Sequence, residues 1–326
     1  MTSIKVFHLK KYFKVYKRNS GILSALGSFF NRKYEIIKAV NDISFEIKQG
    51  ELVGFIGPNG AGKTTTLKCL SGLLWPTKGK IEVLGYRPFD KQTEFLKKIA
   101  LVMGQKNQLW WDLPAIETFR LNKEIYEIGD KNYQEILEEL IALFDVKELI
   151  TIPVRQLSLG QRMKMELIAS LLHKPRVLFL DEPTIGLDVV MQKKMRDFIA
   201  GYRERFNSTI LLTSHYMSDV KSMCKRVIII DHGKLIYDGN LENLIKEYAD
   251  TKVISIDLEG RIDLKEFKIF GEIKSGINGK IILSVPRKFA PEIATTILKK
   301  YQVEDLDIED PEIEDVIRLV FEKNKK

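Results

Sequence analysis

Short apolar runs along the chain alternate with longer stretches in which apolar positions recur every three or four residues. The runs Leu52–Ile56 and Val177–Leu180 are typical of buried strands, because a central strand needs apolar side chains on both faces. Stretches such as Tyr133–Phe144 and Gln161–Leu172 have the period of amphipathic helices. This alternation predicts an α/β fold with a mostly parallel sheet and a helical subdomain over about residues 107–172. Further strands are predicted at Ile43–Ile47, Ile81–Val83, Ile99–Met103, Thr209–Leu212 and Val227–Ile230, and further helices at Lys63–Leu70, Val190–Tyr202 and Met217–Cys224.

The pattern changes beyond about residue 245. Two strands and two helices are predicted there, at Val253–Leu258, Lys280–Val285, Pro291–Tyr301 and Glu312–Lys323. The stretch Glu304–Asp315 holds eight acidic residues in twelve positions, and a solvated face is its default interpretation. We therefore predict a small α+β domain at residues 245–326, after a larger domain at residues 1–244.

Composition narrows the classes of protein that this chain can be. Its 326 residues are 44% hydrophobic and 29% charged, as in an ordinary globular protein. No apolar run approaches the roughly 18–20 residues that cross a bilayer, and the N-terminus lacks the apolar core of a secretory signal. Cys69 and Cys224 stand alone, which suggests neither a zinc site nor a disulfide framework. We expect a cytoplasmic protein.

The excess of basic charge is concentrated at the N-terminus. The chain has 52 Lys and Arg against 44 Asp and Glu, and residues 1–34 contain eight basic residues and no acid. The remainder is neutral, which argues against a general nucleic-acid-binding surface. The basic arm could meet anionic lipid or RNA, or it could be a solvated edge. Within it, Gly21–Phe30 is apolar and could pack against a membrane subunit, the lipid interface or its own domain.

The segment after Leu52–Ile56 has the sequence of a phosphate-binding loop. Residues Gly57-Pro58-Asn59-Gly60-Ala61-Gly62-Lys63-Thr64 fit the pattern G-x-x-x-x-G-K-[ST] and open a predicted helix. Glycines let backbone N–H groups turn inward around phosphate oxygens, and the helix N-terminus adds its partial positive charge. We expect Lys63 to reach the β- and γ-phosphates of a nucleotide and the Thr64 hydroxyl to ligate Mg²⁺.

Two carboxylates end the second buried strand. Asp181 and Glu182 follow Val177–Leu180, and open α/β sheets bind ligands at the carboxyl ends of their strands. We expect Asp181 to hold Mg²⁺, directly or through water, and Glu182 to orient or deprotonate the attacking water. An apolar strand that ends in Asp-Glu is common in proteins, and its place downstream of a phosphate-binding loop favours the functional interpretation.

Together these residues resemble one family, the ATP-binding subunits of ABC transporters. Between the two phosphate motifs lies Leu157-Ser158-Leu159-Gly160-Gln161, similar to the family's LSGGQ signature. The resemblance implies that this segment contacts the γ-phosphate bound by a second subunit, through the Ser158 hydroxyl, a backbone N–H and a helix N-terminus. Leu159 replaces the middle glycine of the signature, which bears on the geometry or the rate of closure.

Other residues match the family in order over roughly residues 1–245. Gln105 resembles the Q-loop glutamine that senses Mg²⁺ and the attacking water, and His215 resembles the switch histidine that touches the γ-phosphate. The segment Gly186-Leu187-Asp188 resembles the D-loop that links the two sites of a dimer, and Asp188 is its aspartate. Thr65 extends the phosphate-binding motif.

An aromatic residue that stacks on adenine is also implied by the resemblance. Tyr34 lies 29 residues before Lys63 and matches that position, and a flat ring suits adenine. Tyr16, Phe29 and Phe30 are competing candidates, because residues 17–33 look like an insertion.

The resemblance implies a P-loop ATPase core with an N-terminal antiparallel β subdomain and a helical subdomain, and ATP and Mg²⁺ as its ligands. It implies a homodimer that sandwiches ATP, and hydrolysis that drives export through separate transmembrane permease subunits on the inner face of the cell membrane. No nucleic acid partner is expected. The motifs are similar to those of daunorubicin-resistance, sodium-exporter and viologen-exporter ATPases. Two alternatives stay open: a soluble ABC ATPase that acts on nucleic acid or the ribosome, and an importer ATPase subunit.

The tryptophans after Gln105 form a candidate docking surface. Trp110 and Trp111 lie where this family docks the coupling helices of its membrane subunits, and tryptophans are suitable interface anchors. The alternative is that one or both are buried in the helical subdomain. The C-terminal domain, in similar exporters, supports dimer contacts or regulation.

Overall fold

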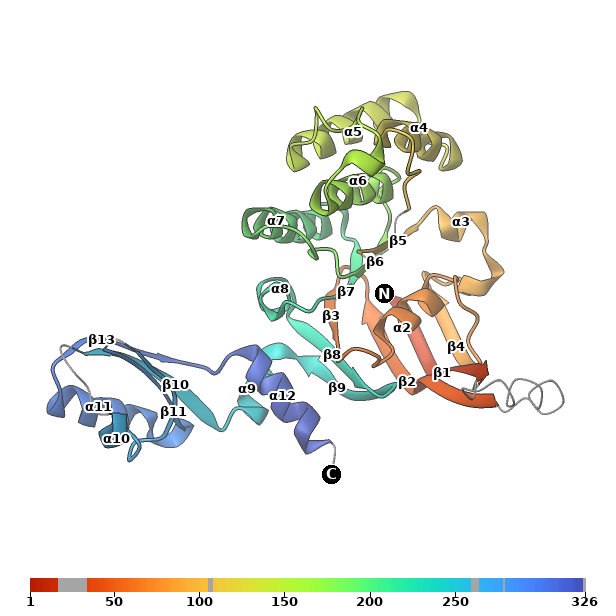
Figure 1. The fold of residues 1–326 in the computed structure, drawn as a ribbon. Coiled ribbons are helices and arrows are strands. Elements are labelled where there is room, and N and C mark those ends of the chain that lie inside the picture. The colour runs from red at the N-terminus through yellow and green to blue at the C-terminus, as the bar shows by residue number, and fades with distance from the viewer. Residues whose placement is uncertain (17–33, 105–107, 259–263, 278, 325–326) are drawn as a thin grey trace, which may run out of the picture. The chain divides into compact units, whose positions relative to one another are not determined.

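The structure is a computed structural model that describes residues 1–16, 34–104, 108–258, 264–277 and 279–324 (Figure 1). The chain divides into two compact units, Met1–Asp238 and Gly239–Lys326. Several predictions fall outside the described residues: Gln105, and the segment 17–33 with its apolar stretch Gly21–Phe30 and the candidates Phe29 and Phe30.

A six-stranded sheet forms the centre of the larger unit. Its strand order is β5-β6-β7-β3-β8-β9, and the strands from β5 to β8 pair in parallel. Every residue of β3, β6 and β7 is buried, as the continuous apolar runs predict for strands covered on both faces. The strands are β3 (Leu52–Ile56), β5 (Ile99–Met103), β6 (Val177–Asp181), β7 (Thr209–Thr213), β8 (Arg226–Asp231) and β9 (Lys234–Asn240).

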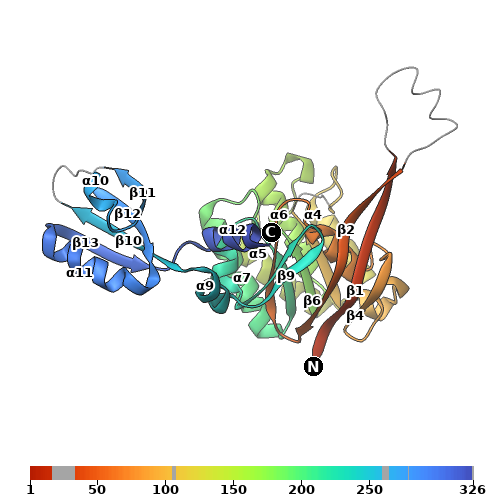
Figure 2. The same ribbon diagram turned by 90° about the horizontal axis from the view of Figure 1, so that it is seen from below.

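A three-stranded antiparallel sheet packs against the first. It consists of β1 (Thr2–Tyr16), β2 (Tyr34–Lys48) and β4 (Lys78–Val83) in the order β2-β1-β4, and β1 and β2 run together as a long hairpin (Figure 2). Apolar side chains of both sheets and of α2 (Lys63–Leu70) share one core. This core holds the start of α2 against the parallel sheet.

Three helices that follow β5 lie together as a separate layer (Figure 1). They are α4 (Ala115–Ile125), α5 (Asp130–Phe144) and α6 (Leu159–Leu171), and they occupy the stretch whose periodicity predicts helices. Among its described residues this unit also contains α3 (Thr93–Leu96), α7 (Val189–Phe206), α8 (Met217–Met223) and the 3₁₀ turns η1 (Pro88–Asp90) and η2 (Val154–Gln156). Within the described part of the chain, no helix has the length and apolar character needed to cross a bilayer.

The smaller unit contains a four-stranded antiparallel sheet in the order β11-β12-β10-β13. Its elements alternate as βαββαβ, the split βαβ arrangement of ferredoxin-like folds. Inward-facing residues of β10 and β12 form a core with α10 and α11. The elements are α9 (Leu241–Tyr248), β10 (Thr251–Leu258), α10 (Leu264–Phe267), β11 (Glu272–Ile277), β12 (Lys280–Pro286), η3 (Arg287–Phe289), α11 (Ala290–Lys300), β13 (Val303–Glu309) and α12 (Ile313–Lys323).

Candidate active site

The loop after β3 holds the phosphate-binding motif in a bent backbone. Gly62 precedes α2 with a φ of +105°, a conformation that favours glycine. A Cβ on Gly62 would lie 2.3 Å from the backbone oxygen of Ala39 in β2, so a larger residue does not fit. The loop is thereby held between β2 and α2, with the helix N-terminus facing it. The other motif residues lie in this loop and in the first turn of α2: Gly57, Pro58, Asn59, Gly60, Ala61, Thr64 and Thr65.

Lys63 is folded into this loop and is 6% exposed. Its Nζ donates to the backbone oxygen of Gly57 at 2.5 Å and to that of Pro58 at 3.1 Å. Burial lowers the pKa of Lys63, and the carboxylates of Glu182 and Asp181 act in the opposite direction. An ammonium group held inside a phosphate-binding loop is suited to contact phosphate oxygens.

Asp181 ends β6 within hydrogen-bond distance of the first turn of α2. Its Oδ2 accepts a hydrogen bond from Thr64 Oγ1 at 2.7 Å, and its Oδ1 accepts one from Thr213 Oγ1 at 2.7 Å. The hydroxyl and the carboxylate are hard oxygen donors in contact, a set that suits Mg²⁺. Thr213 was not predicted; the signal for it was its place at the end of β7, whose register pairs it with Asp181.

Glu182 and His215 lie side by side at the same sheet edge. Glu182 has a φ of +59°, which is uncommon for a residue with a side chain and marks a functional turn. Its Oε1 lies 2.8 Å from His215 Nε2, and its Oε2 is buried without a hydrogen-bond partner among the described residues. A carboxylate that has an unpartnered oxygen and lies beside a histidine can accept the proton of a water molecule.

A cavity of about 390 Å³ joins these groups. It is lined by the phosphate-binding loop, the two carboxylates, His215 and the end of β5. Gly104 N donates to Asp181 O at 2.9 Å, and a Cβ on Gly104 would lie 2.5 Å from the backbone oxygen of Glu182. The chain therefore enters the predicted Q-loop in contact with the backbone of Asp181 and Glu182, although Gln105 itself is not described.

The signature segment and the D-loop segment each begin a helix. Ser158 caps α6: its Oγ accepts from Gln161 N at 3.2 Å, while Gln161 Oε1 accepts from Ser158 N at 2.9 Å. Asp188 caps α7, since its Oδ1 accepts from Met191 N at 2.9 Å. Leu157, Leu159 and Gly160 lie in the same segment as Ser158. None of these signature and D-loop residues lines the cavity beside Glu182.

Tyr34 begins β2, the strand whose Ala39 touches Gly62. The tyrosine is 47% exposed, and Lys14 Nζ lies 4.1 Å from the centre of its ring. Its ring is therefore accessible on the strand that supports the phosphate-binding loop, with a cation on one face.

A buried cluster behind the site was not predicted. Asp219 Oδ2 accepts from Thr184 Oγ1 at 2.6 Å and from Ser214 Oγ at 2.9 Å, and its Oδ1 accepts from Arg196 Nη1 at 2.8 Å. Thr184 follows Glu182 by two positions and Ser214 precedes His215, so this carboxylate joins the two loops of the site. In the sequence, the only sign of this cluster is a short polar residue near each catalytic candidate: Thr184 near Glu182, and Ser214 next to His215.

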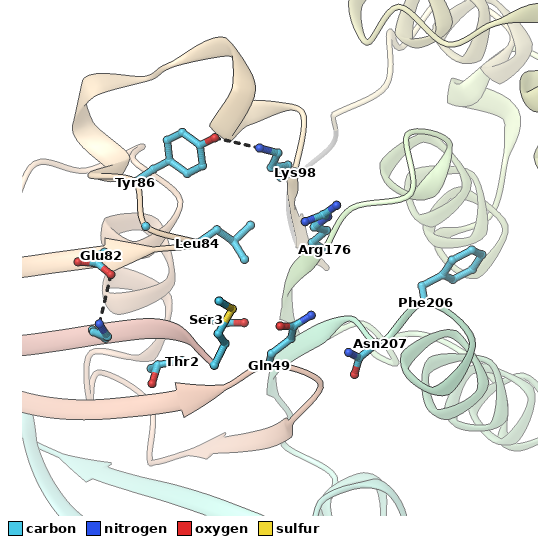
Figure 3. A pocket seen from close by; sticks show the side chains of 13 residues that line it. Thr2, Ser3, Gln49, Glu82, Leu84, Tyr86, Lys98, Arg176, Phe206 and Asn207 are labelled. Atoms are coloured by element: carbon cyan, nitrogen blue, oxygen red, sulfur yellow. Dashed lines mark hydrogen bonds and ion pairs between the residues drawn. The ribbon is translucent and has the colours of Figure 1, made fainter.

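A larger cavity lies at the opposite edge of the parallel sheet. It measures about 660 Å³, and Figure 3 shows Gln49, Arg176 and Asn207, which precede β3, β6 and β7, around it. Because α/β sheets bind ligands at the carboxyl ends of their strands, this cavity is not the nucleotide site.

The geometry defines a P-loop nucleotide-binding protein of the ABC ATPase class. The family described as "ABC transporter" matches residues 40–185, and the family "EvrA-like ABC transporter, C-terminal domain" matches residues 250–309. A solved chain described as "Structure of ATP binding subunit of ABC transporter" superposes with a TM-score of 0.63 at 23% identity, covering 82% of this chain and 98% of the other.

Curated relatives give the same result. The ABC transporter ATP-binding protein NatA of Bacillus subtilis (strain 168) is 35% identical over 66% of this chain and 87% of NatA. The daunorubicin resistance ATP-binding protein DrrA3 of Streptomyces coeruleorubidus is 32% identical over 68% of this chain and 70% of DrrA3. The chain belongs to the family of ATP-binding subunits of ABC transporters. It binds ATP and hydrolyses it. These matches confirm the predicted family, fold and enzymatic class.

Proposed function

We propose that this subunit drives export of a substrate through separate transmembrane permeases. The observation that carries the proposal is one cavity that joins the phosphate-binding loop, Asp181, Glu182 and His215. Membership of the family of ABC transporter ATP-binding subunits supports delivery of the work of hydrolysis to separate transmembrane polypeptides. Export is supported by the similarity to DrrA3, whose name states drug resistance.

In the proposed reaction, a water molecule attacks the γ-phosphorus of ATP, and the bond to the ADP oxygen breaks. Glu182 accepts a proton from this water on its carboxylate, whose Oε2 has no hydrogen-bond partner among the described residues, and His215 steadies the carboxylate through Oε1. Lys63 exchanges its two carbonyl contacts for phosphate oxygens. Thr64 and Asp181 would hold Mg²⁺, which would offset phosphate charge, and Gln105 is the third proposed ligand. Tyr34 stacks on adenine.

Two copies complete each site in this proposal. Ser158, Leu159 and Asp188 start helices away from the cavity of their own chain, so they serve the ATP of a second subunit. The residues after Asp188 support this assignment, because Val189 is 77% exposed and Val190 is 67% exposed. A second copy packed head to tail would cover these valines. ATP then favours the closed dimer, and release of phosphate reopens it.

The permease docks on the tryptophans after the Q-loop. Trp110 is 55% exposed and Trp111 is 49% exposed, which favours an interface over the buried alternative. Trp111 O accepts from Arg155 N at 3.0 Å, and Leu113 O accepts from Val154 N at 3.1 Å. The 3₁₀ turn Val154–Gln156 is followed by Leu157 and Ser158. A displacement of the tryptophans by the permease is therefore transmitted to the signature segment through these backbone hydrogen bonds.

The chain is thus placed on the inner face of the cell membrane by its permease. We propose residues 1–244 as the nucleotide-binding domain, with the helical subdomain at about 107–172, and residues 245–326 as a small domain that supports dimer contacts or regulation. The match of residues 250–309 to a C-terminal domain of EvrA-like ABC transporters supports a separate domain in this part of the chain.

Affinity purification of the tagged chain from native membranes in mild detergent tests the proposal. One or two polytopic proteins in near-stoichiometric amount are expected, and they should be lost from the double variant Trp110→Ala/Trp111→Ala. Trp75→Ala is the matched control, since Trp75 is also exposed but contacts Phe89 outside the docking surface. Recovery of only nucleic acid or ribosomal proteins would contradict the proposal.

A further inference from the structure

Leu159 is the residue by which this signature segment departs from the sequence LSGGQ, and its side chain lies against the D-loop of its own chain. A Cβ built on Gly186 would lie 2.5 Å from Leu159 Cδ2 and 2.9 Å from Leu159 Cγ. The leucine therefore covers the Cα of Gly186, in a contact that only glycine at position 186 permits. Leu159 remains 45% exposed, so the rest of the side chain faces away from the core.

The next residue makes the same connection. A Cβ on Gly160 would lie 3.1 Å from the backbone oxygen of Gly186 and 3.4 Å from Leu187 Cδ2. Two consecutive signature residues thus lie against two consecutive D-loop residues. Gly186 has a φ of +73°, so the D-loop backbone turns sharply at the point of contact.

The signature segment and the D-loop are each also fixed by a helix cap. The capping box of Ser158 and Gln161 holds the start of α6, and the cap from Asp188 to Met191 holds the start of α7. The leucine contact joins two capped helix starts that come from different layers of the unit. Separate loops would have to be ordered one by one when a partner binds, whereas joined loops are ordered together.

We propose that Leu159 is a positioning residue: it holds the D-loop Gly186–Asp188 against the signature segment, so that both face the partner subunit's ATP as one preorganised surface. The inference rests on the proposed function, because it assigns a role in the closure of the ATP-bound dimer. It explains how a leucine is accommodated at this position. The side chain packs on its own D-loop.

A double-mutant cycle tests the contact itself. Gly186→Ala introduces backbone strain and a clash with Leu159 Cδ2, whereas in Leu159→Ala the remaining Cβ would lie 3.7 Å from the new methyl group, an ordinary contact. The strain is common to both backgrounds and cancels in the cycle. In urea unfolding, Gly186→Ala should lower the folding equilibrium constant about tenfold more in the parent than in Leu159→Ala. Equal effects in the two backgrounds would overturn the contact.

The role in closure is measured on the Glu182→Gln background, where ATP-bound dimers should accumulate. Leu159→Ala should weaken ATP-driven dimerisation about three- to tenfold. The alanine lacks the terminal methyl groups that pack on Gly186, so the D-loop is no longer held against the signature segment before the partner binds. The ATP affinity of the monomer, measured below the dimerisation range, should not move, which separates closure from nucleotide binding. Leu96→Ala, at an exposed leucine of α3, is the control and should dimerise as the parent does.

Each outcome bears on a different claim. A coupled cycle with weaker dimerisation supports the proposal, and a coupled cycle with unchanged or tighter dimerisation overturns the role in closure. A Glu182→Gln parent that stays monomeric at saturating ATP contradicts the proposed function and, with it, the role of Leu159 in closure. The cycle in urea still reports the contact in that case, so the two failures are distinguishable.

Discussion

Removal of the Asp219 carboxylate should strongly destabilise the larger unit. The Asp219 side chain is 1% exposed and accepts from Arg196, Thr184 and Ser214. Asp219→Ala leaves the Arg196 guanidinium, whose side chain is 18% exposed, without its carboxylate, and breaking such a pair costs about 3–5 kcal/mol. Because Arg196 retains some water contact, we expect the lower end, about 3 kcal/mol. Asp219→Asn keeps an acceptor but loses the charge, and should cost about 1.5–3 kcal/mol.

Urea unfolding followed by tryptophan fluorescence is the assay. All three tryptophans, Trp75, Trp110 and Trp111, lie in the larger unit, so the signal reports on that unit alone. The control is Arg120→Ala, which removes an exposed pair with Glu117 in the same unit and should cost less than about 1 kcal/mol. The costs of Asp219→Ala and Arg196→Ala should not add in the double variant.

The ATPase rate provides a second readout, because Ser214 directly precedes His215. Asp219→Asn should lower the rate even where the protein is fully folded, since the one amide oxygen cannot accept from both Arg196 and Ser214, which weakens the anchor of the histidine loop. The reasoning is refuted if Asp219→Ala costs less than about 1 kcal/mol, or if the effects of Asp219→Ala and Arg196→Ala add.

Three further predictions use buried groups of the larger unit. Gly62→Ala should abolish ATP binding by equilibrium dialysis, because its Cβ would lie 2.3 Å from Ala39 O, whereas Gly129→Ala, with nothing within 4 Å, should bind as the parent. Burial raises the pKa of the Cys69 thiol to about 11 and also raises that of the Cys224 thiol. Neither thiol should therefore react with a thiol reagent at pH 8 until urea unfolds the chain. Fast reaction in the native protein would be inconsistent with the burial of the two thiols. Burial also raises the pKa of Glu166 above its ordinary value of 4.5, so its contribution to stability is lost as pH rises through the raised folded-state pKa. Glu166→Gln should therefore gain stability relative to the parent as pH rises from 4.5 into the neutral range, and no pH-dependent difference would contradict the shift.

Local patterns were sufficient for the elements that hold the nucleotide. The predicted strand at Leu52–Ile56 matches β3 residue for residue, and that at Val177–Leu180 matches β6 apart from Asp181 at its end, because a buried parallel strand needs a continuous apolar run. The phosphate-binding motif follows from its glycines, which the φ values of Gly60 and Gly62 require. The helices of the insertion follow from their periodicity.

Other elements could not be predicted, for reasons that the structure shows. β1 has no steady alternation because it is irregular between Val6 and Leu9, where His8 has a φ of +48°. β13 is rich in acidic residues, which are poor strand formers, and it pairs with β10 through the backbone at the edge of its sheet. The cluster around Asp219 joins residues from separate loops and helices, and no spacing in the sequence indicates it.

The measurement that tests the account most directly is sedimentation of the Glu182→Gln variant with and without ATP, together with its rate of ATP hydrolysis. The account predicts a monomer without nucleotide and a stable dimer at saturating ATP, with turnover reduced at least about a hundredfold because the proton acceptor is lost. A variant that also carries Lys63→Ala should remain monomeric, since the phosphate-binding loop is then incomplete. A Glu182→Gln variant that stays monomeric with ATP, or that hydrolyses ATP at the parent rate, would contradict the account.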